Sequence, residues 1–497
     1  MLYQSTRNGT DLISGAEAIV RGISEDGGLF VPQSFPVLTD DMINLLTKKT
    51  YSERAAYIMS LFLNDFSSTE LTEFCEEAYR EPGFTHSSTA PLHKLDKITH
   101  FLELWHGPTC AFKDMALQVM PRVLTASLHK AGEARDVCIL VATSGDTGKA
   151  ALEGFRDVPG TKIIVFYPRD GVSDVQELQM TSQAGENVYV ISVEGNFDDA
   201  QTGVKAIFSN KELSTVLNEK RIFLSSANSI NWGRLVPQIV YYVSAYCDLL
   251  NCGDIEPGEK INFCVPTGNF GNILAAYYSE LMGLRINKLI CASNRNDVLT
   301  QFIKTGVYDK NRPFYTTVSP SMDILVSSNL ERLLFELSGK NGGAVSAYMS
   351  ALADEGRYIV PGAVQSEINR IFACGHCSET DTMATIGDTF KHHGYLIDTH
   401  TAVAYKVLDD YRETTGDNTL SVVVSTASPF KFCDSVITAL GQPHSGGGVA
   451  LIDRLAEITG TAVPAPLAAL KDQTPRFTES VPVEGMEAAV RWFLGGE

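Results

Sequence analysis

Short apolar runs alternate with amphipathic stretches of helical length from about residue 95 onward. Several runs are apolar almost throughout, which is typical of parallel strands buried on both faces of a sheet. The runs are Val137–Ala142, Lys162–Tyr167, Asn187–Val193, Arg221–Ser225, Ile261–Val265, Lys288–Ala292 and Ser421–Ser425. Helices are expected between them, for example over Asp198–Ser209, Trp232–Leu250 and Asn272–Met282. This alternation predicts an α/β protein with open parallel sheets.

Other regions have a different pattern. Residues 1–90 mix short apolar and charged stretches, which predicts mainly helices with at least one turn-rich segment. Residues 310–400 are poor in strand signals and richer in helix, and Asn251–Lys260 has the composition of a linker. We therefore predict three parts: a mainly helical region over 1–95, a smaller α/β domain over 96–255 and a larger α/β domain over 256–497.

Composition narrows the class of protein. The 497 residues are 44% hydrophobic and 20% charged, as in soluble globular proteins, and the formal net charge is −19. An acidic chain repels nucleic acid and anionic membrane surfaces at long range. The start of the sequence has no signal-peptide pattern, and no apolar run approaches membrane-spanning length. We expect a cytoplasmic protein without nucleic-acid or membrane partners.

The loop Pro266–Asn272 (PTGNFGN) follows an apolar run and precedes a helical stretch. Glycines let the backbone approach a ligand closely, and the N–H groups of the first helical turn would point at it. This combination favours phosphate binding, although an ordinary strand-to-helix turn has the same local pattern. The spacing is not G-x-G-x-x-G, and the chain has no G-x-x-x-x-G-K-[ST] motif. Neither a nicotinamide dinucleotide nor a nucleoside triphosphate is therefore favoured.

Two further loops follow apolar runs. Residues 142–148 (ATSGDTG) open a helix, and their hydroxyl and N–H groups suit a carboxylate or phosphate. The alternative there is a helix N-cap with a capping hydroxyl. Residues 425–432 (STASPFKF) lie at the carboxyl end of a strand, where open α/β sheets bind ligands. A plain strand terminus would have the same appearance.

The presence of these loops supports a catalytic role for one lysine. Lys113 ends the segment WHGPTCAFK, and a lysine after an aromatic residue is usually a surface side chain. The alternative is a partly desolvated amine that forms a Schiff base. Two anion-binding loops in the same α/β frame favour the second interpretation.

A series of blocks resembles the threonine synthase family. They are, in chain order, QSTRNG with AIVRGISEDGGLFVP, FLELWHGPTCAFKD, ATSGDTG, ANSINWGRL, VPTGNFGN, SMDILVSSNLERLLFEL, SETDTMATI, DTHTAVA and STASPFKF. The resemblance covers essentially the whole chain and is nearest to the longer microbial and fungal branch. It implies the tryptophan-synthase-like fold of pyridoxal enzymes, with two open, mostly parallel sheets flanked by helices. The Schiff-base lysine would belong to the smaller domain and the phosphate loop to the larger one.

The resemblance implies pyridoxal 5′-phosphate as the cofactor. Lys113 stands at the position that forms the Schiff base, and Thr426 matches the hydroxyl residue that hydrogen-bonds the pyridine nitrogen. The residues that match the loop holding the cofactor phosphate are Gly268, Asn269, Phe270, Gly271 and Asn272. Related enzymes often have Asn where this chain has Asp146. The usual amide contact to the cofactor's 3′-oxygen is therefore not implied here.

The implied substrate is O-phospho-L-homoserine, which would react with water to give L-threonine and phosphate by elimination and water addition. The positions that match its carboxylate loop are Thr143, Ser144 and Thr147. The positions that match the block holding its phosphate are Asn228, Ser229 and Arg234. For Arg234 the plain alternative is an ion pair with an acid on its own helix.

Two other functions stay open. One is a threonine-synthase-like phospholyase, which eliminates phosphate from a related substrate without making threonine; the other is a catalytically silent ligand-binding homologue. No metal is expected, because Cys374 and Cys377 lack a second C-x-x-C pair. His392, His393 and His400 are too irregularly spaced for a metal site and are expected to be structural or exposed. The sequence is compatible with a monomer.

Overall fold

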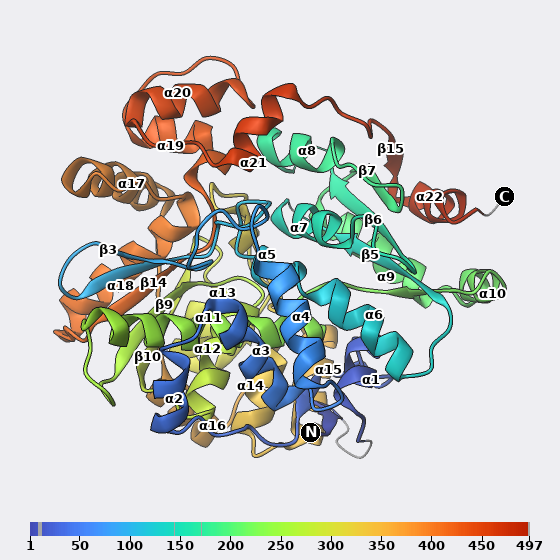
Figure 1. Cartoon of the computed structure of the whole chain (residues 1–497), viewed down its shortest axis with the longest axis horizontal. Helices are drawn as coiled ribbons and strands as arrows, with labels where there is room; N and C mark the ends of the chain where they lie inside the picture. Colours follow the sequence, from blue (N-terminus) through green and yellow to red (C-terminus); the bar gives the residue numbers. More distant parts are fainter. Residues whose placement is uncertain (8–11, 144, 170, 496–497) are drawn as a thin grey trace.

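The computed structural model describes residues 1–7, 12–143, 145–169 and 171–495 (Figure 1). The N-terminal region is mainly helical, as predicted, with one short antiparallel ribbon of two strands. Its elements are β1 (Tyr3–Ser5), α1 (Gly15–Arg21), β2 (Phe30–Pro32), α2 (Asp40–Leu46), α3 (Tyr51–Phe62) and α4 (Ser68–Tyr79). Helices α1, α3 and α4 each begin with a capping box, in which a Ser or Thr and a Glu three residues later satisfy each other's backbone N–H groups.

Six strands form the larger sheet, in the order β13-β10-β9-β14-β4-β3. All neighbouring strands are parallel except β3 and β4. The strands are β3 (Leu92–Lys94), β4 (Thr99–Glu103), β9 (Ile261–Pro266), β10 (Ile286–Ser293), β13 (Phe372–His376) and β14 (Ser421–Ser425).

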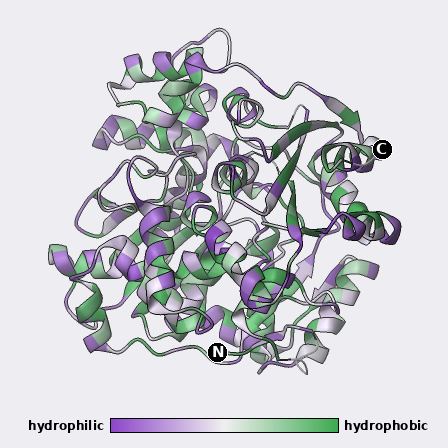
Figure 2. Cartoon of the chain, turned by 45° about the vertical axis from the view of Figure 1, so that its right-hand side comes forward, coloured by the Kyte–Doolittle hydropathy of each residue, from purple (hydrophilic) through white to green (hydrophobic). Residues whose placement is uncertain are grey.

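Both faces of this sheet are covered, which explains the continuous apolar runs. Phe263 and Val265 of β9 join the core that includes α12 (Gly271–Leu281), whereas Cys264 between them joins the core that includes α18 (Thr399–Thr415). Successive side chains of a strand point to opposite faces, so a strand with helices on both sides must be apolar at every position. The same pattern is visible in Figure 2 for the second, smaller sheet, whose strands are mainly green, the hydrophobic colour.

Five parallel strands form the smaller sheet, in the order β15-β7-β6-β5-β8. They are β5 (Asp136–Ala142), β6 (Thr161–Pro168), β7 (Val188–Glu194), β8 (Ile222–Ser225) and β15 (Ser480–Pro482). Alternate residues of β5 and β6 again belong to two separate cores. The predicted fold class, two open and mostly parallel sheets flanked by helices, is confirmed.

The remaining helices cover these sheets and connect their strands. They are α5 (Asp114–Leu117), α6 (Met120–Lys130), α7 (Asp146–Phe155), α8 (Asp174–Thr181), α9 (Phe197–Ser209), α10 (Lys211–Glu219), α11 (Trp232–Cys252), α13 (Val298–Thr305), α14 (Leu330–Leu337), α15 (Gly342–Asp354), α16 (Gly362–Ile371), α17 (Glu379–His393), α19 (Cys433–Ala439), α20 (Ala450–Thr459), α21 (Ala465–Ala468) and α22 (Met486–Phe493). Short 3₁₀ turns are η1 (Pro320–Met322), η2 (Pro429–Lys431), η3 (Ala469–Asp472) and η4 (Val483–Gly485), and β11 (Val307–Asp309) pairs with β12 (Arg357–Ile359). None of the helices in the described residues is both long and apolar enough to cross a membrane.

Sheet membership departs from the predicted segments at three places. Strands β3 and β4 belong to the larger sheet although they lie within 1–95 and 96–255, and β15 joins the smaller sheet although it lies within 256–497. None of these strands was predicted, because each is short, and β4 and β15 pair with strands far away in the sequence. The domain limits themselves stay a prediction.

Candidate active site

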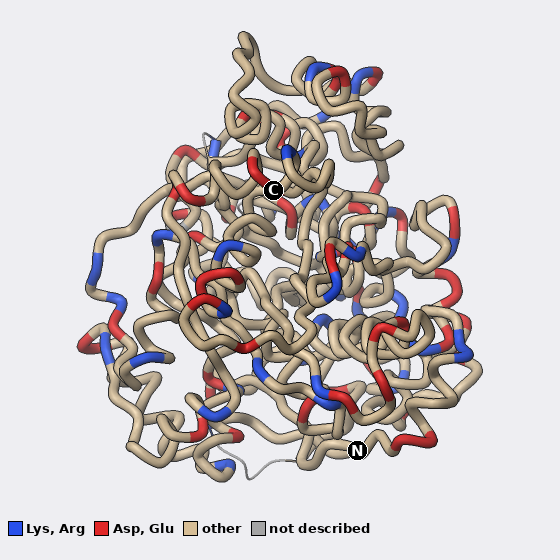
Figure 3. The backbone as a smooth tube through the Cα atoms, turned by 90° about the vertical axis from the view of Figure 1, so that its left-hand side faces the viewer, with Lys and Arg blue, Asp and Glu red and all other residues tan. Residues whose placement is uncertain are grey.

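Charged residues are spread along the whole chain (Figure 3), and several of them are buried. Burying a charge is costly unless it is paired, and unusual buried charges often mark functional sites. The buried Asp, Glu, Lys and Arg residues in the described parts of the chain are Arg54, Asp114, Asp146, Arg234, Glu331, Arg332, Asp398 and Lys431. Three of them, Asp146, Arg234 and Lys431, belong to segments that the sequence marks as ligand-binding.

The lysine loop is fixed against the segment that follows β14. The Phe112 N–H donates to the carbonyl of Thr426 over 2.8 Å, and the Ser428 N–H donates to the carbonyl of Cys110 over 3.0 Å. These bonds bring Lys113 and the buried Thr426 together from segments more than 300 positions apart.

The Lys113 amine is enclosed by protein, although part of the side chain remains accessible. Its Nζ lies 4.1 Å from the centre of the Phe112 ring, and no described residue accepts a hydrogen bond from it. Desolvation is the main reason that the pKa of Lys113 falls to about 7, and the positive charge of Arg234 adds to this shift. A neutral amine near pH 7 is a nucleophile and a base, so the local environment suits Schiff-base chemistry.

The loop before α12 forms a cradle for an anion. Phe270 has a positive φ of 63° and turns the chain into the first helical turn. At Gly268 a Cβ atom would lie 2.7 Å from the carbonyl oxygen of Ser321, so only glycine fits. The buried Asn272 accepts hydrogen bonds from two tyrosine hydroxyls, those of Tyr241 at 2.6 Å and Tyr242 at 2.5 Å.

This arrangement leaves a donor without a partner. Among the described residues, Nδ2 of Asn272 is buried and makes no hydrogen bond. A buried amide nitrogen rarely goes unpaired in a folded protein. Together with the helix N-terminus, the amide fits an anionic ligand bound at this loop.

Residues that the sequence reasoning missed support the cradle from outside. The Asn329 amide donates to the carbonyl of Asn269 and to Oγ of Ser229, each over 3.0 Å. The hydroxyl of Ser327 donates to the carbonyl of Gly268 over 2.8 Å. Asn329 thus connects the predicted cofactor-phosphate loop with the predicted substrate-phosphate segment. The only sequence signal for Ser327 and Asn329 is that they belong to the SSNLERLLFEL block, which does not reveal these contacts.

The predicted carboxylate loop connects β5 to α7. The hydroxyl of Thr143 accepts hydrogen bonds from the N–H groups of Gly145 and Gly148, each over 3.0 Å, so it stabilises the loop itself. Ser144 lies outside the described residues. The half-buried Thr147 turns toward Arg234, whose Nη2 donates to its hydroxyl over 3.4 Å.

Arg234 is the cation of the predicted substrate-phosphate segment. It is 4% exposed, and its Nη1 donates to the carbonyl of Ala227 over 2.7 Å. Burial lowers the pKa of Arg234 to about 10. No carboxylate of the described residues forms an ion pair with it, so the alternative that it pairs with an acid on its own helix is wrong. Asn228 and Ser229 are half-buried in the turn that leads into the same helix.

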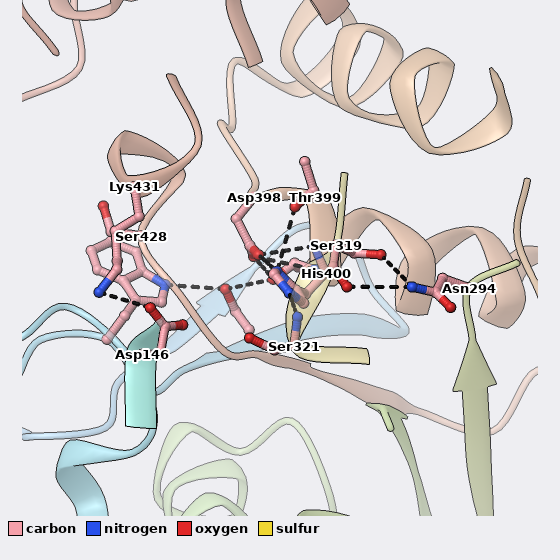
Figure 4. A network of polar contacts seen from close by, with 12 residues as sticks. Asp146, Asn294, Ser319, Ser321, Asp398, Thr399, His400, Ser428 and Lys431 are labelled. Atoms are coloured by element: carbon pink, nitrogen blue, oxygen red, sulfur yellow. Dashed lines mark hydrogen bonds and ion pairs between the residues drawn. The ribbon is translucent and has the colours of Figure 1, made fainter. Parts of the chain in front are cut away.

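A network of polar contacts surrounds His400 (Figure 4). His400 is 3% exposed, so this histidine is not a surface residue. Its Nδ1 lies 2.8 Å from a carboxylate oxygen of Asp398, and its Nε2 accepts the Ser321 N–H over 3.2 Å. Asp398 also accepts hydrogen bonds from the N–H and the hydroxyl of Thr401. The Thr401 hydroxyl oxygen lies 3.1 Å from Oγ of Ser425. The network therefore links the end of β14 to the segment that packs on Gly268.

Comparison with known proteins identifies the family. Three family descriptions match consecutive parts of the chain: Threonine synthase N terminus over residues 2–79, Pyridoxal-phosphate dependent enzyme over residues 85–357, and Threonine synthase, C-terminal over residues 401–490. The chain belongs to the threonine synthase family. This family uses pyridoxal phosphate, and the free amine of Lys113 and the unpaired amide of Asn272 fit that cofactor.

Individual relatives agree with this membership. Human threonine synthase-like 1 is 42% identical over 436 residues, which cover 86% of this chain but 58% of that protein. Threonine synthase of Pseudomonas aeruginosa is 40% identical over 444 residues, 89% of this chain and 91% of that protein. The crystal structure of PLP-bound threonine synthase from Brucella melitensis has a TM-score of 0.87 and 37% identity, with 99% of both chains covered. This threonine synthase family member thus spans little more than half of its human relative.

The phosphate cradle gives a first prediction. Gly271→Asp should weaken pyridoxal phosphate binding by a few kcal/mol, because it places a negative charge in an anion site. Gly271→Ala is the matched control, since its Cβ would lie no closer than 3.4 Å to Asn329 and 3.5 Å to Ser229. Fluorescence titration of the cofactor-free protein measures both affinities. Equal affinities for the two variants would mean that charge is not what this loop recognises.

The depressed pKa of Lys113 gives a second prediction. Only the neutral amine attacks an aldehyde, and the pKa is lowered to about 7 by desolvation and by Arg234. The rate at which cofactor-free protein captures pyridoxal phosphate should therefore rise with pH through about 7 and level off above it. Stopped-flow absorbance at a series of pH values measures this rate. A rate that continues to climb toward pH 10 would show an ordinary lysine.

Proposed function

We propose that the protein is a threonine synthase, which converts O-phospho-L-homoserine and water to L-threonine and inorganic phosphate. One observation carries the proposal: a buried Arg234, unpaired with any described carboxylate, lies close enough to Lys113 to lower the pKa of that amine. A substrate with a phosphate group at one end supplies the missing anion. The threonine synthases among the relatives support the same reaction.

In this proposal the cofactor is held at three places. Lys113 would bind its aldehyde, and the hydroxyl of Thr426, a buried residue, would hydrogen-bond the ring nitrogen. The cradle holds the phosphate through backbone N–H groups and the Asn272 amide, using Gly268, Asn269, Phe270, Gly271 and Asn272. When bound, the cofactor supplies an electron-accepting ring that delocalises negative charge at the substrate's Cα. The neutral hydroxyl of Thr426 would not stabilise a protonated ring nitrogen, so the ring would accept electrons less strongly than a protonated ring does.

The substrate is proposed to bind through its two anionic ends. The loop with Thr143, Ser144 and Thr147 takes the carboxylate, and because the Thr143 hydroxyl is already used inside the loop, Thr147 and backbone N–H groups make the contacts. Arg234 takes the phosphate, with Asn228 and Ser229 beside it. A guanidinium can bind two phosphate oxygens at once, which fixes the orientation of the leaving group.

Lys113 is proposed to move the protons. Its amine removes a proton first from Cα and then from Cβ of the substrate. The Cγ–O bond breaks, phosphate leaves with the bonding electrons, and Arg234 stabilises the charge that gathers on it. A proton then returns to Cγ, and water adds its oxygen at Cβ. Water loses one proton in this step, which balances the proton that the departed phosphate takes up, and the last proton returns to Cα. The lysine is suited to both directions because its pKa is about 7.

The competing function is a phospholyase. The human relative of 42% identity is called threonine synthase-like 1, so membership of the family leaves the product open. The test is product analysis with O-phospho-L-homoserine as the substrate. Threonine and phosphate in equal amounts support the proposal, whereas 2-oxobutanoate, ammonia and phosphate indicate the phospholyase, and no turnover indicates a silent homologue. The cytoplasmic location and the monomeric state stay predictions.

A further inference from the structure

A buried ion pair joins the two halves of the site. Asp146 is the first residue of α7, which follows β5 of the smaller sheet, and Lys431 ends the turn after β14 of the larger sheet. The Lys431 ammonium lies 2.9 Å from Oδ1 of Asp146, and the two side chains are 0% and 5% exposed (Figure 4). The residues are 285 positions apart in the chain.

Asp146 and Lys431 each form hydrogen bonds with other segments of the chain as well. Nε2 of Gln176 in α8 donates to the same Asp146 oxygen over 2.8 Å. The Lys431 ammonium donates to the carbonyl of Thr109 in the lysine loop over 2.8 Å. The carbonyl of Lys431 accepts the hydroxyl of Ser173, which caps α8, over 3.3 Å. Four segments therefore meet at this pair.

The Asp146 carboxylate is ionised and already engaged. Burial alone would raise its pKa, but the charge of Lys431 and the hydrogen bonds from Gln176 and Lys431 outweigh burial and hold the pKa below its ordinary value. Such a pair is stable only while both charges are present and well placed.

We propose that Asp146 and Lys431 are positioning residues: their ion pair clamps the β5–α7 loop of the smaller sheet to the β14 end of the larger sheet. The clamp sets the gap between the loop that binds the substrate carboxylate and the ring end of the cofactor site. This inference rests on the proposed function for the identity of the ligand at the loop. It assigns Asp146 to the protein framework and not to direct contact with the cofactor.

The clamp has a consequence for single substitutions. Asp146→Asn removes one charge and leaves the Lys431 ammonium buried without an anion. Lys431→Met leaves the Asp146 carboxylate buried without a cation. The double variant Asp146→Asn/Lys431→Met buries neither charge. Replacing both partners of a buried pair by neutral groups is often tolerated, whereas removing one is not.

The experiment compares these three variants with the wild-type holoenzyme. Thermal unfolding, the Kd for pyridoxal phosphate, amide hydrogen exchange in peptides from the start of α7, and KM and kcat for O-phospho-L-homoserine are measured for each. Both single variants should lower Tm by roughly 5 °C, and the double variant should recover most of that loss. All three should exchange faster at the start of α7 and raise KM by about tenfold or more, with the cofactor Kd nearly unchanged.

Several results would overturn the clamp. Recovery of wild-type KM and exchange in the double variant would make the pair purely stabilising. A loss of cofactor affinity in both Asp146 variants, but not in Lys431→Met, would make Asp146 a cofactor ligand. If Lys431→Met does not fold, Asp146→Asn and the double variant still decide between these outcomes. Exchange and Tm need no substrate, so a wild-type protein that fails to turn over O-phospho-L-homoserine would refute the proposed function separately.

Discussion

Lys113→Ala should abolish turnover, with a loss of roughly four orders of magnitude or more. The substitution removes both the amine that attaches the cofactor and the base that moves protons at Cα and Cβ. Wild-type protein should be yellow, and the variant should lose the visible band of the attached cofactor. Steady-state kinetics and absorption spectra of the two proteins measure these effects.

A chemical experiment distinguishes Lys113 from Lys431, the buried lysine of the same site. Borohydride should fix the cofactor on the peptide that contains Lys113. Lys431, whose side chain is 0% exposed, should stay unlabelled although it lies at the same site. The difference is expected because the Lys431 ammonium is held by Asp146 and by the carbonyl of Thr109. A label on Lys431 or on any other lysine would refute the assignment.

Arg234→Leu should lower kcat/KM for O-phospho-L-homoserine by roughly 10- to 150-fold, while the cofactor spectrum stays intact. The change corresponds to about 1.5–3 kcal/mol, the scale of hydrogen bonds to charged groups. A contact made equally in the ground and transition states would raise KM, whereas one that strengthens as phosphate leaves would lower kcat. Steady-state kinetics with the substrate distinguishes the two cases.

Arg54→Leu is the matched control for Arg234. Both arginines are 4% exposed, but Arg54 forms an ion pair with Asp248 at 2.7 Å and donates to Oγ of Ser244 over 2.7 Å. Arg54→Leu should therefore lower Tm without a selective effect on kcat/KM. Unchanged kcat/KM in Arg234→Leu, or an equal loss in both variants, would make Arg234 structural.

Periodicity predicted the central strands well, because strands buried on both faces are apolar at nearly every position. Each of the seven predicted runs overlaps an observed strand, from β5 to β14. Strand β13 was missed because its sequence, FACGH, contains glycine and little β-branched character. Strand β4, THFLE, was missed because its place in the sheet depends on pairing with β14. Such pairing is a tertiary effect that local sequence does not contain.

The sequence predicted the residues that would contact the ligands better than the residues that hold them in place. Loops with glycine and hydroxyl residues at strand ends drew attention to the cradle and to Lys113, and the structure brings Lys113 beside Thr426 and close to Arg234. Supporting residues such as Asn329 and Lys431 act on side chains and carbonyls of distant segments. Their residue types are common on protein surfaces, so no local pattern separates them from solvent-exposed positions.

The central claim, threonine formation, is tested most directly with O-phospho-L-homoserine in water enriched in ¹⁸O. The account predicts equal amounts of threonine and phosphate, with the label in the threonine hydroxyl and none in the phosphate. This pattern follows because the Cγ–O bond breaks and solvent oxygen enters only at Cβ. Unlabelled threonine, 2-oxobutanoate with ammonia, or homoserine with labelled phosphate would each contradict it.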